Sequence, residues 1–364
     1  MIFEEENFSS PPNFKYEETI SKESDCLSNC NTFDLYNEKN NDIILITPCI
    51  DPINFNNEEF NINLINLNNN EITKKLSGHK DRILSVKLFQ NPKTKNIYLL
   101  SVDKGHNIII WDIEKNFQKI FEKKFEYELN TFIYSALIIF GESNTWVVAS
   151  SISEKNKTLV IDMSDMNKSE NFVEIKESEN IPIYCLLYWF NKNEENEKDK
   201  HNIIQCGKNR ILITQFPSNT TYYSIHQNPI KYYSGCIIYQ LKEKDYLAIS
   251  SCSGTIIIFD LEEKNIVKNF DISGGVHLFS FIKWNENYLM VIDTRNKKLI
   301  IMDMINNYKI VSRNFLSELG IGVYMKKLRH PKYGESVLIS GKDWTIKLFT
   351  LKGVMRIIDN DDFE

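Results

Sequence analysis

The sequence predicts an all-β protein, a seven-bladed β-propeller with four antiparallel strands in each blade. One observation is a short apolar run that recurs seven times at intervals of 43 to 52 residues. Another is that each interval holds about four short apolar runs joined by polar turns, which is the signature of a propeller blade. The third is the length of 364 residues. A single compact core rarely grows beyond roughly 250–300 residues, so a chain of this length favours a repeat architecture or two domains.

The first set of runs ends in a bulky apolar residue that is often followed by Asp. These anchor residues are Ile65, Trp111, Ile161, Ile213, Phe259, Met302 and Phe349. Their successive intervals are 46, 50, 52, 46, 43 and 47 residues. The longest interval contains the charged stretch NKNEENEKDKHN at 191–202, which is predicted to be a loop insertion. Seven anchors predict seven blades.

A second set of runs precedes five of the anchors by 18 to 24 residues and usually ends in an aromatic residue. They end at Phe89, Phe140, Trp189, Tyr239 and Trp284. A third run lies between the two sets, for example IYLLSVD or WVVASS, and a fourth follows the anchor, for example NIVKNFDIS. A helical repeat would instead place apolar residues at i, i+3, i+4 and i+7 through most of each unit. The units are therefore predicted to be sheets.

The second unit, SGHKDRILSVKLF followed by IYLLSVD and NIIIWD, resembles a blade of the WD-repeat propeller family. The resemblance extends over roughly residues 30–359. It implies a hydrogen-bonded chain of a His, a Ser or Thr, an Asp and a Trp that locks each blade. In this unit its members would be His79, Ser101, Asp103 and Trp111. Trp111 is then expected to be structural, although Asp103 stands eight residues before it, two more than the family spacing.

The other units depart further from the family pattern. In the last unit, SGKDWTIKLFT, Asp343 keeps the family spacing, while Phe349 replaces the Trp and Thr350 replaces the Asp that follows it. In the fifth unit Ser253 stands where the Asp would be, and the Gly-His pair occurs only once in the chain. The chain therefore resembles a degenerate member of the WD-repeat family. The resemblance rests on the seven units together and not on any single unit.

A closed ring requires a fourth, outer strand for the last blade, because an unpaired strand edge invites aggregation. Two segments could supply it, VMRIID at 354–359 or NFKYEETI at 13–20. The family resemblance favours the second segment, which lies within an acidic N-terminal arm at 1–29. The expected organisation is this arm, a propeller over 30–359, and an acidic tail at 360–364.

The net charge of −6 is concentrated at the two ends of the chain. Residues 1–29 carry −5 and residues 354–364 carry −3, which leaves +2 on the remainder. A nearly neutral body does not favour nucleic-acid binding, which needs clustered basic charge. No stretch approaches the ~18 apolar residues of a membrane helix, so no integral membrane association is expected.

The compartment is predicted from the cysteines and the N-terminus. The start, MIFEEENFSSPP, has no basic region and no apolar run, so it does not resemble a secretory signal. The seven cysteines show no spacing typical of a disulfide framework. A reducing compartment, the cytoplasm or alternatively the nucleus, is therefore expected.

No motif indicates an enzyme, a cofactor or a metal site. No Gly-rich loop precedes a Lys-Ser/Thr pair, and GIGVYM at 320–325 lacks the third Gly of a dinucleotide fingerprint. Cys26 and Cys30 have no second Cys or His pair at zinc-finger spacing. The six histidines fall in or beside predicted turns, and nothing in the sequence favours a convergent Ser, His and carboxylate.

The remaining candidates lie on a rim of the ring. In the family, the turns that enter strand one and those that join strands two and three share one rim. Trp344, in the turn KDWTI, is typical of an interface hot spot, and the alternative is that it folds back over a neighbouring blade. The basic residues expected on this rim, which would suit an acidic peptide, are His106, Lys104, Lys80, Arg82 and Arg295.

The predicted function is a non-enzymatic scaffold or adaptor that presents rim loops to other proteins or peptides. Loops held on a rigid β scaffold lose little entropy on docking, so modest contacts give useful affinity. On this hypothesis Trp344→Ala weakens partner capture and leaves thermal stability nearly unchanged. The alternative is a propeller that binds anionic lipid or phosphate through the basic run MKKLRHPK at 325–332, near the opposite rim. The partner's identity and the oligomeric state stay open.

Overall fold

The protein is described here from a computed structural model of the whole chain. The residues whose structure is described are 11–21, 33–38, 42–50, 60–124, 132–142, 144–152, 158–163, 172–174, 183–196, 200–207, 210–216, 218, 220–226, 233–251, 253–272, 278–293, 296–315, 322–341 and 345–351. These residues form 28 strands and no α-helix. No helix among them is long and apolar enough to cross a membrane.

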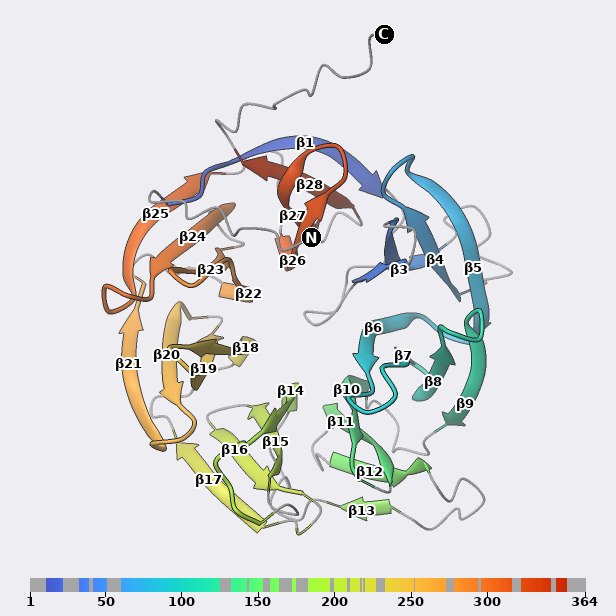
Figure 1. Cartoon of the computed structure of the whole chain (residues 1–364), viewed down its shortest axis with the longest axis horizontal. Helices are drawn as coiled ribbons and strands as arrows, with labels where there is room; N and C mark the ends of the chain where they lie inside the picture. Colours follow the sequence, from blue (N-terminus) through green and yellow to red (C-terminus); the bar gives the residue numbers. More distant parts are fainter. Residues whose placement is uncertain are drawn as a thin grey trace, which may run out of the picture.

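The strands form seven four-stranded antiparallel sheets arranged in a ring, so the predicted seven-bladed propeller is confirmed (Figure 1). Blade 1 comprises β2 (Asp34–Asn37), β3 (Ile43–Ile50), β4 (Phe60–Asn66) and β5 (Glu71–His79). Blade 2 comprises β6 (Ile83–Gln90), β7 (Ile97–Asp103), β8 (Asn107–Asp112) and β9 (Gln118–Lys124). Blade 3 comprises β10 (Phe132–Phe140), β11 (Thr145–Ile152), β12 (Thr158–Asp162) and β13 (Phe172–Glu174).

The second half of the ring repeats the same order of strands, from the centre outwards. Blade 4 comprises β14 (Ile183–Phe190), β15 (His201–Gly207), β16 (Arg210–Gln215) and β17 (Thr220–His226). Blade 5 comprises β18 (Tyr233–Leu241), β19 (Lys244–Ser251), β20 (Thr255–Asp260) and β21 (Asn265–Asp271). Blade 6 comprises β22 (Leu278–Lys283), β23 (Tyr288–Asp293), β24 (Lys298–Asp303) and β25 (Lys309–Phe315). Blade 7 comprises β26 (Gly322–His330), β27 (Gly334–Gly341), β28 (Ile346–Leu351) and β1 (Phe14–Ser21).

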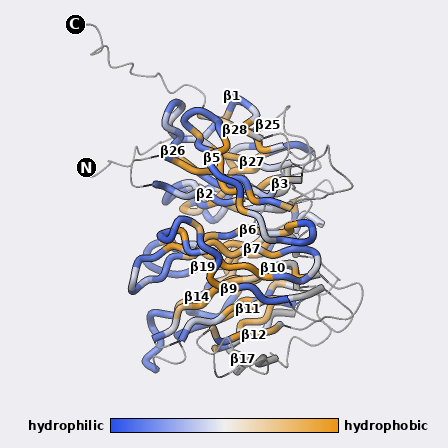
Figure 2. The backbone as a smooth tube through the Cα atoms, turned by 90° about the vertical axis from the view of Figure 1, so that its right-hand side faces the viewer, coloured by the Kyte–Doolittle hydropathy of each residue, from blue (hydrophilic) through white to orange (hydrophobic). Residues whose placement is uncertain are grey.

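The hydrophobic core is divided among the junctions between neighbouring blades. Seven buried apolar clusters occur, one at each junction of the ring. Figure 2 shows the apolar segments running through the strands and the polar segments at the turns. Each sheet is apolar on both faces and cannot shield either face alone, so the blades gain stability by packing on each other around the ring.

The seven anchors all lie on the third strand of a blade, but one of them faces the other way. Trp111 packs with Ile44 and Ile62 of the preceding blade, and five other anchors also pack on the preceding blade. Ile213 instead packs with Leu247 of the following blade. Its neighbour Thr214 occupies the place of the anchor. The register expected for blade 4 was therefore wrong by one residue, which on a strand moves a side chain to the opposite face.

The outer strand of blade 7 is β1, which comes from the N-terminal end of the chain. β1 pairs antiparallel with β28, with Phe14 opposite Leu351 and Ser21 opposite Ile346. The other segment considered for this place, 354–359, lies outside the described residues. In Figure 1, β1 lies across the outside of blade 7 between β25 and β5.

The inner strands carry one covalent link that the cysteine spacing did not predict. The structure joins Cys185 on β14 to Cys236 on β18 by a disulfide, although the two residues are 51 positions apart in the sequence. Their strands are the innermost strands of blades 4 and 5 (Figure 1). Cys49 and Cys206 are also buried.

Candidate functional site

Blade 2 contains a continuous chain of hydrogen bonds between buried polar side chains. His79 Nδ1 lies 2.8 Å from Asp103 Oδ2, and His79 Nε2 lies 2.7 Å from Ser101 Oγ. The indole Nε1 of Trp111 donates to the same Ser101 Oγ at 3.0 Å. The structure therefore brings together the four residues that the WD-repeat resemblance assigns to the structural chain.

The Ser-His-Asp part of this chain has the connectivity of a hydrolase triad, but it cannot reach a substrate. Ser101 is 0% exposed, and the side chains of His79 and Asp103 are 0% and 1% exposed. A nucleophilic serine must instead face a cavity where a substrate carbonyl and donors for its oxyanion can lie. These residues satisfy each other's polar groups inside the blade.

The buried chain fixes two turns at one rim of blade 2. Asp103 Oδ1 accepts the backbone N–H of Asn107 at 2.8 Å, which closes the turn 104–106. The backbone N–H of Lys104 donates to the carbonyl of Arg82 at 2.8 Å, so this turn is tied to the turn 80–82. We call the rim formed by turns of these two kinds, those that enter a first strand and those that join second to third strands, the upper rim.

Four of the residues expected at the rim lie in these two turns. Lys80 and Lys104 are exposed, and Arg82 and His106 are half-buried. His106 has a φ of 68°, a left-handed conformation that a non-glycine residue adopts only where the surrounding structure requires it. The two turns thus present a compact basic group, Lys80, Arg82, Lys104 and His106, which we call the blade 2 basic rim.

The stretch of chain that contains this rim, residues 71–124, is more positive than the chain as a whole. Residues 71–124 contain twelve Lys or Arg and six Asp or Glu, in a chain whose net charge is −6. Two of the six acids, Asp103 and Asp112, are buried. A hydrogen bond from Lys119 lowers the pKa of Glu122, with further contributions from Asn107 and Lys80, so this carboxylate stays ionised beside the rim.

Three of the expected residues lie outside the described part of the chain. They are Trp344, Asp343 and Arg295, and their roles stay predictions. Phe349 is described and is fully buried on β28, where its ring centroid lies 5.9 Å from that of Tyr16 on β1. It therefore packs where blade 7 receives its outer strand.

The basic run 325–332 is largely occupied by intramolecular contacts. Lys326 Nζ contacts a carboxylate oxygen of Asp34, and Lys327 Nζ lies 3.0 Å from Glu335 Oε2. Burial lowers the pKa of Lys326, but the neighbouring Tyr324 and Asp34 outweigh burial and raise the pKa above its usual value. His330 is buried. Two of the cations that a phosphate would need are thus already paired, which gives no support to the lipid or phosphate alternative.

The turn-fixing role of Asp103 recurs in blades where the WD-repeat pattern is lost. In blade 5, Ser251 Oγ accepts the backbone N–H of Thr255 at 2.9 Å. In blade 6, Asp293 Oδ1 accepts the backbone N–H of Asn296 at 3.1 Å. The sequence resemblance pointed to Ser253 in blade 5 and missed both positions. The available signal was a polar residue at the end of the second strand. No group of three or more His, Cys, Asp or Glu that could hold a metal occurs within the described ranges.

Comparisons with known proteins show the fold and do not show a family. No protein-family model and no curated protein matches the sequence. Among solved structures, the chain is similar to the β-propeller domain of Cps50 (Swd1) from Myceliophteria thermophila, at 15% identity over 93% of this chain and 99% of that chain, with a TM-score of 0.62. It is also similar to BBS1N in complex with ARL6DN, at 11% identity over 95% of this chain and 99% of that chain, with a TM-score of 0.63.

Proposed function

We propose that this protein is a WD-repeat-like propeller that serves as a non-enzymatic scaffold or adaptor, and that it binds acidic segments of partner proteins at the blade 2 basic rim. The observation that carries the proposal is the hydrogen-bond network that ties two basic turns to a buried His79-Asp103 pair. The network ties together the backbones of the two turns that carry Lys80, Arg82 and Lys104.

The proposed mechanism is rigid presentation of charge. Loops that are already fixed lose little conformational entropy when a partner docks, so more of the contact energy remains as affinity. Clustered lysines and arginines also accelerate the encounter with an acidic partner, and this effect weakens as salt screens the charges. Neither step requires a chemical reaction. We also propose a cytoplasmic or nuclear location, where the Cys185–Cys236 pair would be oxidised only under oxidising conditions.

The solved neighbours support a protein partner. BBS1N was crystallised in complex with ARL6DN, so a chain of nearly the same fold holds a protein ligand. The neighbours do not indicate which partner this chain binds, and the charge of the blade 2 basic rim is the reason to propose an acidic one.

The experiment is affinity capture from native lysate with matched charge-reversal variants. The test variant is K80E/R82E/K104E, and the control is K264E/K268E/K309E, which makes the same charge change on the outer parts of blades 5 and 6. Partners held by the proposed rim should be captured by the wild type and by the control, and should be lost from the test variant. Their recovery should also fall between about 0.05 M and 0.3 M salt. Equal capture by the test variant and the wild type would refute the proposal.

A further inference from the structure

Three of the seven cysteines meet at the junction of blades 4 and 5. Cys185 lies on β14, Cys206 on β15 and Cys236 on β18, and all three pack in the same apolar cluster. Cys185 and Cys236 are joined by the disulfide, and Cys206 is present as a thiol. The three residues are far apart in the sequence, so the fold alone brings their sulfurs to one place.

Cys206 is the direct neighbour of Cys185 across two strands. The pairing of β14 with β15 places Cys185 opposite Cys206. Opposed residues of an antiparallel pair point to the same face, with Cα atoms about 4.5–5.5 Å apart. Disulfides usually span Cα–Cα distances of about 4.4–6.8 Å, and the bond from Cys185 to Cys236 spans 7.0 Å. Cys185 therefore has two partners within reach, one in its own blade and one in the next.

The opposed position in blade 5 holds a different side chain. The pairing of β18 with β19 places Cys236 opposite Ile249. A cross-strand bond within the blade is thus available to Cys185 and is not available to Cys236. Cys185 is the sulfur that both bonds share, and a change of partner at Cys185 leaves Cys236 as a thiol.

Exposure also separates the three residues. Cys185 and Cys236 are half-buried, so a dissolved thiol or disulfide can approach them. Cys206 is 1% exposed and packs among the apolar side chains of the cluster. Thiol–disulfide exchange requires access of one sulfur to another. The reactions of Cys206 are therefore restricted to the sulfur beside it, that of Cys185.

We propose that Cys185, Cys206 and Cys236 form a redox-sensitive switch, in which Cys185 exchanges its disulfide partner between Cys236 of blade 5 and Cys206 of its own blade. Cys206 gives its proton to water, and its thiolate attacks Cys185 Sγ. The bond between Cys185 and Cys206 forms as the bond between Cys185 and Cys236 breaks. Cys236 leaves as a thiolate and takes up a proton. One disulfide replaces another, so the exchange needs neither an oxidant nor a reductant.

The two bonds have different consequences for the ring. The bond to Cys236 ties the innermost strands of two consecutive blades together (Figure 1), whereas a bond to Cys206 lies within blade 4. The exchange therefore removes the covalent tie between blades 4 and 5 and turns the half-buried Cys236 into a thiol that solvent reaches. From the fully reduced protein, oxidised glutathione would form either bond, and it would take up the two electrons and become two reduced glutathione molecules. The switch is separate from the blade 2 basic rim and from its partners.

The variant Cys236→Ser tests whether Cys185 uses its second partner. The full chain is reduced, freed of reductant, incubated with oxidised glutathione and quenched with N-ethylmaleimide in guanidinium chloride. Trypsin cleaves after Lys192, Lys208 and Lys231, so the three cysteines fall on different peptides that mass spectrometry can pair. Cys236→Ser should form the bond between Cys185 and Cys206. The matched control, Cys206→Ala, should form only the bond between Cys185 and Cys236.

The wild type tests the exchange itself and needs no substitution. The oxidised protein is incubated without glutathione, at about pH 8.5, where a cysteine thiol is substantially ionised. The bond between Cys185 and Cys206 should appear as the bond between Cys185 and Cys236 declines, and iodoacetamide should label Cys236 in step with this change. The same treatment of Cys206→Ala should leave Cys236 protected.

Two results would overturn the proposal. One is a Cys236→Ser protein that stays reduced, or pairs only with glutathione, under conditions that fully oxidise Cys206→Ala. The other is a wild type in which the bond between Cys185 and Cys236 persists unchanged at about pH 8.5, where thiolates attack disulfides readily. Thermal melts of the reduced proteins check that each variant folds, and the wild-type exchange decides the question if one does not.

Discussion

Asp103 accepts two hydrogen bonds inside blade 2, one from His79 Nδ1 and one from the backbone N–H of Asn107. It stands two residues further from Trp111 than the family spacing allows, yet it reaches the same partners. The turn 104–106 absorbs the extra length, and His106 does so with a left-handed backbone. Sequence spacing alone does not reveal such a turn, because its conformation depends on the contacts around it.

Asp103→Ala should therefore be among the most damaging single substitutions. It leaves a buried imidazole and a buried backbone N–H without their acceptor, and we expect a loss of about 3–5 kcal/mol in the free energy of unfolding. Ser251→Ala in blade 5 is the matched control. Ser251 Oγ accepts the equivalent backbone N–H, that of Thr255, and lies 2.9 Å from Ser253 Oγ. Its loss should be about 1 kcal/mol. Urea unfolding measures both, and similar small losses would contradict the structural role of the chain.

His330 gives the fold a pH dependence. Its Nδ1 accepts the backbone N–H of Lys332 at 3.1 Å. Burial lowers the pKa of His330 below its usual value of 6.5, although Glu18 partly opposes this shift. As the pH falls, His330 is therefore protonated at a higher pH in the unfolded chain than in the folded protein. The contribution of the neutral ring is complete above about pH 6.5 and is lost as the pH falls through the lower pKa of the folded state.

Replacing His330 by Gln should remove this part of the pH dependence. The wild type should lose stability between pH 7.5 and pH 5.5, and the variant should lose distinctly less over the same range. Thermal melts at several pH values, with the two proteins side by side, measure the difference. Parallel curves would show that His330 does not titrate between the folded and unfolded states.

At the scale of strands, the period of the sequence was sufficient to predict the architecture. All seven anchors fall on third strands, because each strand needs an apolar run on both faces and each turn needs polar residues. The phase of a single strand was harder to predict, as Ile213 shows. In RILITQ both Leu212 and Ile213 are apolar and precede the buried Thr214, so the pattern alone does not decide which face points to which blade.

The Cys185–Cys236 disulfide links two strands, and no pattern in the sequence predicts it. The two residues lie on the inner strands of consecutive blades, and their proximity follows from the curvature of the ring. Because the bond closes a long loop, chain-entropy models predict that it stabilises the folded state by about 3–4 kcal/mol.

The variant C185S/C236S should therefore melt below the oxidised wild type, by several degrees for a chain of this size, about 5 °C. Dithiothreitol should lower the melting temperature of the wild type to a similar value and should leave that of the variant unchanged. Mass spectrometry of the unreduced protein checks that the bond is present. A wild type that melts equally with and without reductant, with the bond confirmed, would contradict the stabilising role.

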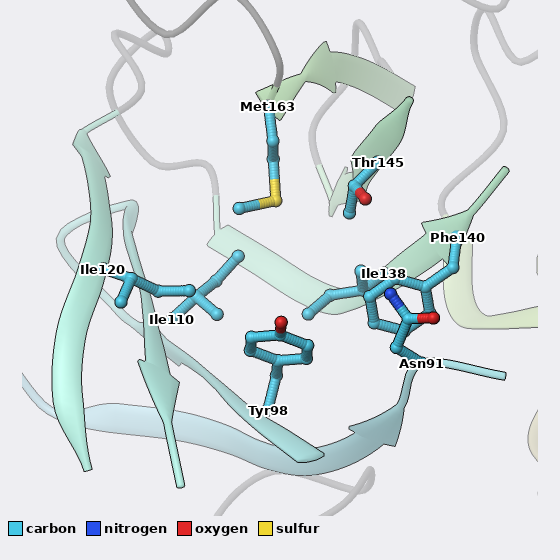
Figure 3. Close-up of a pocket in the computed structure, with 8 residues that line it drawn as sticks. All are labelled: Asn91, Tyr98, Ile110, Ile120, Ile138, Phe140, Thr145 and Met163. Atoms are coloured by element: carbon cyan, nitrogen blue, oxygen red, sulfur yellow. The ribbon is translucent and has the colours of Figure 1, made fainter. Parts of the chain in front are cut away.

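The candidate sites could be predicted only in part. The two turns of the blade 2 basic rim follow from the position of Lys80, Arg82, Lys104 and His106 in the repeat. A cavity of about 220 Å³ lies between blades 2 and 3 (Figure 3). It could not be predicted, because its walls come from two different blades that only the fold brings together.

At the scale of the whole molecule, closure of the ring depends on a strand from the opposite end of the chain. β1 contacts three blades. Thr350 Oγ1 on β28 donates to Glu17 Oε1 at 2.7 Å, and Asn314 of blade 6 donates to the carbonyl of Pro12 at 2.9 Å. Asn70 of blade 1 donates to Glu18 Oε2 at 3.1 Å.

One buried ring on β1 adds to these hydrogen bonds. Phe14 is 1% exposed, and its ring meets Trp284 of blade 6 edge-to-face at a centroid distance of 5.1 Å. Such a contact stabilises by the area that it buries and by its ring geometry. β1 thus joins blade 7 to both of its neighbours, and the ring is closed by backbone pairing and by apolar packing together.

Removal of residues 1–21 should open the ring. The truncated protein leaves β28 as an unpaired edge and exposes the apolar surface under Phe14, so it should self-associate and melt at least about 10 °C lower. Removal of residues 1–10 is the matched control, because it keeps all of β1, and it should have little effect. A synthetic peptide of residues 11–21 added to the longer truncation should restore a monomer in light scattering and raise the melting temperature, since the edge of β28 is its only template. A longer truncation that stays monomeric and equally stable would show that six complete blades and a three-stranded blade 7 hold the ring without β1.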